Sequence, residues 1–186
     1  MELVYKNLTI RSLQTADAEQ LCEWWNDRIA MAREGFPNGL GCTPEEIREI
    51  IANDTGGAYR RHIIELDGKP IGEMNYRGRG MAAELGIEIH DSAEREKGYG
   101  TTLLTIFTDA LFTHYGFEKA VLSANAKNER ARYVYEKKLG FRLVGIEKDS
   151  WRNYLGEPQS TVNFEIDKAE WFAAHKERPP YVYRGQ

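Results

Sequence analysis

The segment from Arg95 to Thr101 has the residue types of a turn that binds an anion. Gly98 and Gly100 can take positive φ, and without a Cβ they let a ligand come close to the backbone. A helix is expected to begin directly after them, and its first amides, which lack intrahelical acceptors, would point at a phosphate group. The side chains of Arg95 and Lys97 could add charge-assisted contacts. The same R-x-x-G-x-G pattern also fits an ordinary tight turn between a strand and a helix.

Two better-known phosphate-binding patterns do not fit this turn. No Gly-Lys-Ser/Thr follows it, so it is not a Walker loop. A dinucleotide-binding fold would need the turn early in a βαβ unit and an acidic residue at the end of the next strand. That strand ends here in Ser123-Ala124-Asn125. A nucleotide-phosphate-binding module of another kind stays open as an alternative.

A second motif, N-x-x-A-x-x-x-Y-E-K-x-L-G-F, lies downstream and spans Asn128 to Phe141. Its Asn is expected to cap a helix, and its Gly-Phe to lead into a strand. The two motifs in this order resemble those of the GNAT superfamily of N-acetyltransferases. The pattern from Leu8 to Trp25 (a strand, an acidic residue and a helix ending in tryptophans) resembles the branch with ribosomal-protein, spermidine and some aminoglycoside acetyltransferases. The resemblance extends over residues 8–166.

The resemblance implies acetyl transfer from acetyl-CoA, a co-substrate, to a primary amine by direct attack in a ternary complex. The pyrophosphate would lie on the amides of the turn, and the pantetheine arm would pair with the end of the preceding strand. The implied cofactor-binding residues are Glu88, Ile89, His90, Arg95, Glu96, Lys97, Gly98, Tyr99, Gly100, Thr101 and Asn128. The first three would contribute main chain, so their side chains need have no role. No metal is expected, because no pair of histidines has metal-ligand spacing.

Two side chains are implied as catalytic. Tyr135 matches the family tyrosine that protonates the leaving thiolate of CoA, a role that suits a phenol, although packing against the sheet would also explain it. Glu84, on the strand before the turn, matches the family's general-base glutamate, which takes a proton from the incoming ammonium directly or through a water. Strand alternation puts Glu88 on the same face, and Glu73 lies on the neighbouring strand, so both compete with Glu84. A chain of waters without a single base is a further alternative.

The amine acceptor is expected to contact the variable segments Trp24–Gly41 and Trp151–Ser160. Aromatic and acidic side chains there could form a wall that attracts a cation. The candidates are Trp24, Trp25, Phe36, Trp151, Tyr154, Asp27 and Glu34. The two adjacent tryptophans are better explained as core residues of their helix. A polyamine, an aminoglycoside and a protein N-terminus all fit as acceptors, and a non-catalytic acyl-CoA-binding regulatory domain is the rival function.

Alternating strands and helices must hold these residues in place. The predicted strands cover 8–13, 59–66, 69–77, 83–89, 119–123, 141–148 and 161–166. The predicted helices cover 18–25, 44–53 with a stop at Gly56-Gly57, 101–115 and 128–139. This order indicates the α/β class: one GNAT-like domain, residues 1–167, with a mixed, mostly antiparallel sheet of about seven strands and four helices. Residues 168–186 are expected to form a short helix and a tail with little order.

Charge and composition narrow the class of protein. A net charge of −4 and a pI near 5.7 argue against a general binder of nucleic acid or acidic membranes. Cys22 and Cys42 are too few for a disulfide scaffold. No apolar stretch approaches a membrane span, and Met1–Arg11 is too polar for a signal peptide. The expected protein is soluble and cytoplasmic, with a homodimer as an option.

Overall fold

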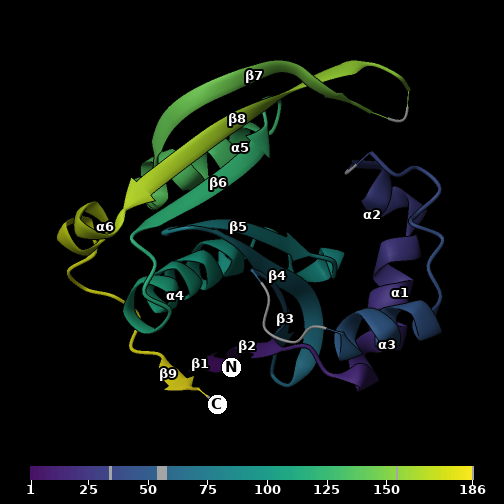
Figure 1. Cartoon of the computed structure of the whole chain (residues 1–186), viewed down its shortest axis with the longest axis horizontal. Coiled ribbons are helices and arrows are strands. Elements are labelled where there is room, and N and C mark those ends of the chain that lie inside the picture. The colour runs from purple at the N-terminus through teal and green to yellow at the C-terminus, as the bar shows by residue number, and fades with distance from the viewer. Residues whose placement is uncertain (34, 54–57, 154, 186) are drawn as a thin grey trace.

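The computed structural model describes residues 1–33, 35–53, 58–153 and 155–185. They form one nine-stranded sheet in the order β7-β8-β6-β5-β4-β3-β2-β1-β9, with helices packed against it (Figure 1). The strands are β1 (Glu2–Tyr5), β2 (Leu8–Ser12), β3 (Tyr59–Leu66), β4 (Lys69–Arg79), β5 (Ala82–Ile89), β6 (Lys119–Asn125), β7 (Arg142–Arg152), β8 (Pro158–Asp167) and β9 (Val182–Arg184). The helices are α1 (Ala18–Asn26), α2 (Arg28–Arg33), α3 (Pro44–Ala52), α4 (Tyr99–His114), α5 (Glu129–Tyr133) and α6 (Lys168–Ala174). A π-helical turn, η3 (Val134–Lys138), continues α5.

The predicted α/β class with a mostly antiparallel sheet is confirmed, because among the described strands only β5 and β6 pair in parallel. The predicted counts are too low: the described residues hold nine strands and six α-helices. The additional strands β1 and β9 have four and three residues, too few to show a periodicity in sequence. The predicted stop at Gly56-Gly57 lies outside the described residues. None of the described helices has both the length and the apolar character needed to cross a bilayer.

The C-terminal tail is part of the sheet, which corrects the prediction of a poorly ordered end. β9 pairs antiparallel with β1, placing Tyr183 opposite Leu3. The ring of Tyr183 also stacks on His114 at the end of α4, with centroids 3.9 Å apart. The hydroxyl of Tyr181 donates to buried Asp109 of α4 over 2.9 Å. Aromatic contacts with α4 therefore hold the tail in place.

Two apolar clusters fix the helices on the sheet. The face predicted for α4 is buried as expected, and its residues are Leu103, Leu104, Phe107, Ala110 and Leu111. A second cluster packs Leu21 and Trp25 of α1 with Ile47 of α3 against Ile63 of β3. In Figure 1 the helices α1–α3 are grouped on the side of β3–β5 away from α4. Side chains of α1 therefore reach the sheet face opposite α4.

The two central strands pair only at their beginnings, which positions the site. Ala82–Leu85 of β5 lie beside Lys119–Leu122 of β6, and the strands diverge after Leu85. β5 reaches Ile89 because β4 still pairs with it, and at Gly72 of β4 an added Cβ would lie 2.2 Å from the carbonyl oxygen of Glu88. Only glycine permits that close approach.

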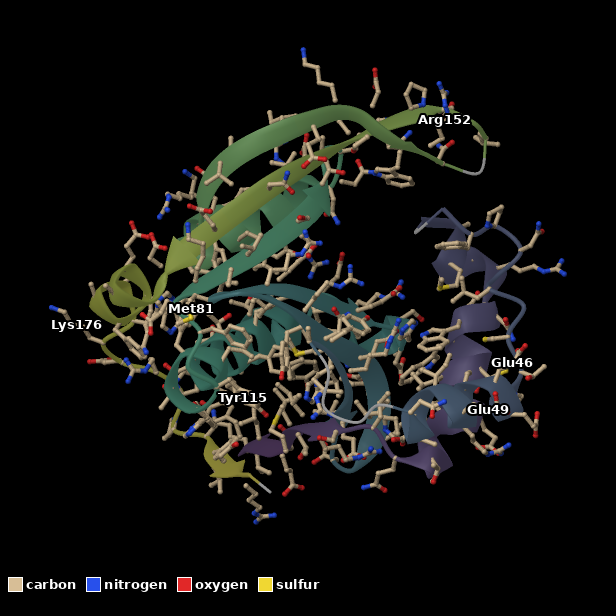
Figure 2. All side chains as sticks on the ribbon, viewed as in Figure 1. Glu46, Glu49, Met81, Tyr115, Arg152 and Lys176 are labelled. Carbon is tan, nitrogen blue, oxygen red and sulfur yellow. The ribbon has the colours of Figure 1, made fainter. Side chains whose placement is uncertain are left out.

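The β7–β8 hairpin is longer than predicted, and it extends beyond the rest of the sheet. β7 continues to Arg152, so both ends of the predicted connection Trp151–Ser160 are strand. Figure 2 shows Arg152 toward the far end of this hairpin, on the side where α2 lies in Figure 1. The hairpin therefore carries the residues after Lys148 away from the sheet and toward the N-terminal helices.

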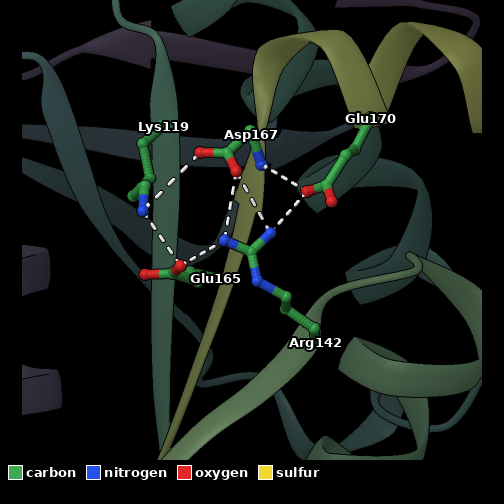
Figure 3. Close-up of polar contacts among 5 residues, drawn as sticks. All are labelled: Lys119, Arg142, Glu165, Asp167 and Glu170. Atoms are coloured by element: carbon green, nitrogen blue, oxygen red, sulfur yellow. Dashed lines mark hydrogen bonds and ion pairs between the residues drawn. The ribbon is translucent and has the colours of Figure 1, made fainter.

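An ion-pair network joins β6, β7, β8 and α6 at the base of the hairpin (Figure 3). The guanidinium of Arg142 lies 2.6 Å from Glu170 and 3.1 Å from Asp167. The Nζ atom of Lys119 lies 2.9 Å from Glu165, and this hydrogen bond holds the pKa of Glu165 below its usual value. Solvent screens these partly exposed pairs, so their main effect is to fix where the hairpin begins.

Candidate active site

A cavity of about 870 Å³ opens where β5 and β6 diverge. It is bounded by β4, β5, the glycine turn with the start of α4, the end of β6, α5 with η3, and one residue of each hairpin strand. The predicted site residues that line it are Glu88, Ile89, Arg95, Glu96, Gly98, Tyr99, Gly100, Thr101, Asn128 and Tyr135. His90, Lys97 and Glu84 are not part of the lining. The fold thus brings the two sequence motifs to one cavity.

The glycine turn has the geometry expected of an anion cradle. Gly98 has φ of +87° and is the N-cap of α4, with no side-chain cap on the helix end. A Cβ added at Gly98 or Gly100 would meet no atom within 4 Å. The first turn of a 16-residue helix therefore faces open space with its positive dipole end, which favours a phosphate group.

The basic side chains of the turn are already engaged within the protein. Arg95 donates from Nε to the carbonyl oxygen of Ile89 over 2.7 Å and from a terminal nitrogen to that of His90 over 3.3 Å. Lys97 pairs with Glu94 at 2.9 Å. Arg95 therefore ties the turn to the end of β5, and its guanidinium positions the backbone as well as adding positive charge.

Asn128 and Tyr135 come from the second motif. The side chain of Asn128 caps α5 by accepting from the amide of Ala131 over 3.0 Å. The helix then widens into η3, where the amide of Leu139 donates to the carbonyl of Val134, five residues earlier, over 3.0 Å. Such π-helical turns occur often at functional sites. Tyr135 sits in this turn, and its side chain lines the cavity.

The three carboxylates considered as the general base differ in their position relative to the cavity. As predicted, Glu84 and Glu88 share one face of β5, and Glu88 lies opposite Glu73 of β4. Glu88 and Glu73 line the cavity, whereas Glu84 pairs with Arg79 at 3.0 Å outside it. Glu84 is therefore the one of these three carboxylates that lies outside the cavity lining.

Glu73 is a buried carboxylate with three partners. It accepts from Nε1 of Trp25 over 2.8 Å and pairs with Arg61 at 3.0 Å. Its Oε1 lies 3.6 Å from Nε2 of His90. Burial opposes the charged form, but the interactions with His90, Arg61 and Trp25 outweigh it and hold the pKa of Glu73 below its usual value. Glu73 is thus a fixed anion and a weak proton acceptor.

His90 has a side-chain environment that its predicted main-chain role does not account for. Its side chain is 2% exposed, and Nε2 lies 3.6 Å from Glu73 and 3.8 Å from Glu88. The indole of Trp24 stacks on the ring, with centroids 4.6 Å apart and planes 9° from parallel. One carboxylate oxygen of Glu73, one of Glu88 and one imidazole nitrogen of His90 all lie within 4.8 Å of one another. Local spacing could not reveal this cluster, because it joins two strands and a helix.

The sequence pattern of the acetyltransferase (GNAT) domain matches residues 7–142, most of the chain. The chain belongs to the GNAT acetyltransferase family. One similar solved structure is spermidine N-acetyltransferase from Vibrio cholerae in complex with CoA and spermine: 24% identity, TM-score 0.79, covering 89% of this chain and 98% of that one. Another is a ribosomal L7/L12 α-N-protein acetyltransferase in complex with CoA: 14% identity, TM-score 0.77, covering 88% of this chain and 96% of that one.

A third similar structure is a ribosomal-protein-S5-alanine acetyltransferase from Vibrio fischeri: 17% identity, TM-score 0.76, covering 92% of this chain and 98% of that one. At these identities the likeness to solved structures concerns the fold. Comparison with curated proteins gave no match. The resemblance drawn from the two motifs is confirmed, and the chain is a GNAT acetyltransferase.

The predicted aromatic wall of this GNAT acetyltransferase is only partly formed. Trp25 is a core residue, 6% exposed, whereas Phe36 is 49% exposed. Asp27 caps α2 by accepting from the amide of Ile29 over 2.8 Å. Trp151 lines the cavity, and its ring would lie 3.4 Å from a Cβ built on Gly35. The predicted residues Tyr154 and Glu34 lie outside the described residues.

Proposed function

We propose that the protein transfers the acetyl group of acetyl-CoA to a primary amine by direct attack in a ternary complex. The observation that carries the proposal is the meeting of the glycine turn, the edge of β5 beyond its pairing with β6, and Tyr135 around one cavity. Acetyl-CoA supplies the activated thioester carbonyl. Neither described cysteine lines the cavity, which supports direct attack over transfer through an acyl-cysteine.

The proposed role of Tyr135 is that of general acid. Its side chain is 8% exposed and packs edge-on against Phe164, with centroids 5.6 Å apart. Packing of this kind holds a phenol in one orientation, and Tyr135 is among the residues that line the cavity. A phenol stays protonated at neutral pH, so it has a proton to give to the leaving sulfur.

The proposed role of Glu88 is to receive the proton that the acceptor ammonium must lose. Glu84, which the resemblance implied, lies outside the cavity and is paired with Arg79. Glu73 lines the cavity but is held as an anion by Arg61 and Trp25. Position therefore favours Glu88 among the three carboxylates.

A contact between the β7–β8 hairpin and the loop after α2 favours a small acceptor. Trp151, on the β7–β8 hairpin, lines the cavity and packs beside Gly35 in the loop after α2. The hairpin and the N-terminal helices thus meet across the acceptor side. A contact there obstructs an extended polypeptide, whereas a polyamine or an aminoglycoside needs no open groove. We therefore favour a small amine over a protein N-terminus.

Thermal unfolding with excess acetyl-CoA tests the proposal, with ATP and NAD as controls. A ligand present at 100 times its dissociation constant stabilises the fold by about 2.7 kcal/mol, which raises Tm by several degrees. A shift with acetyl-CoA alone justifies a screen for thiol release with polyamines, aminoglycosides and an N-terminal peptide. No shift contradicts the proposal, and a shift with ATP alone supports a nucleotide-binding module instead.

The rival function is a non-catalytic acyl-CoA-binding regulatory domain. It predicts the same shift with acetyl-CoA but no thiol release with any amine. The cavity position of both Tyr135 and Glu88 favours the enzyme, because a binding domain has no need of a proton donor and an acceptor beside the thioester. Thiol release that depends on an amine separates the two functions.

A further inference from the structure

One ion pair joins the glycine turn to α5 across the lining of the cavity. Arg130 of α5 donates from a terminal nitrogen to the carboxylate of Glu96 over 2.5 Å. Both residues line the cavity, and they come from the two separate sequence motifs. Glu94, just before the turn, pairs locally with Lys97 at 2.9 Å. Glu96 is therefore the acid of this region whose partner lies on another wall of the cavity.

This ion pair places a carboxylate beside the cradle that is expected to hold phosphate. Glu96 lies two residues before Gly98, the N-cap of α4, and its backbone is left-handed, with φ of +66°. Such a φ is uncommon for any residue that is not glycine. A carboxylate so close to the cradle repels a phosphate group, because two negative charges repel at short range even in water. The acid at this position thus opposes the anion that the cradle favours.

The charge of the lining as a whole does not favour a polyanion such as CoA. The described lining residues include four acids and three bases: Glu73, Glu88, Glu94 and Glu96 against Arg95, Lys127 and Arg130. CoA carries negative charge on its pyrophosphate and on its 3′-phosphate. The guanidinium of Arg95 already donates to the backbone carbonyls of Ile89 and His90. Arg130, whose acceptor is an exposed side chain, can exchange that acceptor for a phosphate.

Exposure makes the Glu96–Arg130 pair easy to exchange. The side chains of Glu96 and Arg130 are 79% and 56% exposed. An ion pair this exposed contributes little, because water solvates both charges when they separate. A phosphate group is a better partner for the guanidinium, since the planar fork of donors fits two phosphate oxygens in charge-assisted hydrogen bonds. Exchange of the carboxylate for a phosphate on Arg130 is therefore favourable.

We propose that Glu96 competes with acetyl-CoA for Arg130. In the free protein Arg130 pairs with Glu96, and in the complex it binds a phosphate group of acetyl-CoA while Glu96 turns to solvent. The inference rests on the proposed use of acetyl-CoA and deepens it, because Arg130 becomes a second anion ligand beside the amides of the turn. It also reverses the binding role that the resemblance implied for Glu96, whose side chain weakens the complex.

The same competition acts on the product. CoA keeps every phosphate group after acetyl transfer, so Glu96 competes with bound CoA for Arg130 as well. Product release is the slow step in many enzymes. An internal competitor weakens the binding of substrate and product alike, and so it shortens the time that CoA stays bound after each turnover.

Calorimetry of CoA and acetyl-CoA binding to the full chain, at low ionic strength, tests the competition. Glu96→Gln removes the charge and keeps the backbone requirement, so Kd is expected to fall about twofold to fivefold for both ligands. Arg130→Gln is expected to raise Kd at least about fivefold. In the Arg130→Gln background, Glu96→Gln is expected to lower Kd by a smaller factor, because no ion pair is left to break.

Glu129→Gln is the matched control. Glu129 precedes Arg130 on α5 and is exposed, but it is not among the described residues that line the cavity. Its substitution removes a nearby charge of the same sign, which solvent screens, and Kd should stay within about 1.5-fold of wild type.

The outcomes separate the competition from the proposed function. If wild type binds CoA, equal or weaker binding by Glu96→Gln overturns the competition alone. Unchanged binding by Arg130→Gln also overturns it, as does tightening by Glu129→Gln that equals the tightening by Glu96→Gln. A wild-type chain that binds neither CoA nor acetyl-CoA overturns the proposed function instead.

Discussion

Trp25 donates its indole N–H to Oε1 of Glu73 over 2.8 Å and so joins the last turn of α1 to the central strand β4. Both groups are buried, so this bond couples the packing of the N-terminal helices to the floor of the cavity. It also explains why Trp25 behaves as a core residue and not as part of an open aromatic wall.

Replacing this indole tests the coupling. Trp25→Phe keeps most of the ring but leaves the Glu73 carboxylate without one donor, so the free energy of unfolding is expected to fall by about 1–3 kcal/mol. Urea unfolding followed by circular dichroism measures it. In a Glu73→Gln background the same substitution is expected to cost less, because a neutral acceptor needs its donor less. An equal loss in both backgrounds would mean that the negative charge of Glu73 adds nothing to the strength of this bond.

The lowered pKa of His62 predicts that acid destabilises the fold. Burial, aided by the positive charge of Arg60, lowers the pKa of this imidazole to about 3. The unfolded chain takes up the proton near pH 6.5, so the stability contribution of neutral His62 is complete above that pH. It is lost as pH falls toward 3, at up to about 1.4 kcal/mol per pH unit.

Urea unfolding between about pH 7 and pH 5 measures this slope. His62→Phe retains packing against Tyr76 and Phe107 and is expected to flatten it. His114→Phe serves as the control and should keep the wild-type slope. The His114 ring, at the end of α4, stacks on Tyr183 of the tail. Glu73, whose pKa is lowered, adds its own loss only below about pH 4.3, outside this window. An unchanged slope in His62→Phe would rule His62 out as the cause.

Tyr135→Phe removes the proposed proton donor and keeps the aromatic ring. We expect kcat to fall by about 100-fold, with KM for acetyl-CoA within about twofold of wild type. Thiol release under saturating acetyl-CoA measures the change. Tyr133→Phe, two residues earlier and 55% exposed, removes the same hydroxyl outside the cavity and should leave kcat unchanged. Similar rates for both variants would leave no acid role for Tyr135.

Gly98 and Gly116 flank α4 and allow a paired test of the cradle. Both have positive φ, +87° and +74°, and an added Cβ would meet no atom within 4 Å at either site. Alanine at either position therefore costs about the same backbone strain, of order 1 kcal/mol. Only Gly98→Ala puts a methyl group where phosphate is expected, so acetyl-CoA should bind at least about tenfold more weakly. Calorimetry of both variants measures it, and equal weakening would place the anion elsewhere.

Local sequence determined the elements and the two motifs. Gly98, the N-cap Asn128 and the apolar face of α4 are specified within a few residues, because turns, caps and helical faces depend on neighbours in the chain. Their order along the chain was enough to indicate the family and its co-substrate. The short pieces β1, β9 and α2 escaped this reasoning, since each takes its stability from the elements beside it.

The tertiary structure decided which carboxylates line the cavity. Glu84 and Glu88 share one strand face, and only the divergence of β5 from β6 after Leu85 places one in the cavity and leaves the other outside. The ring of His90 gains its neighbours only in the fold, where α1 places Trp24 on it and β4 brings Glu73 to its Nε2. Burial and electrostatic pairing are sums over non-local neighbours, so no window of sequence contains them.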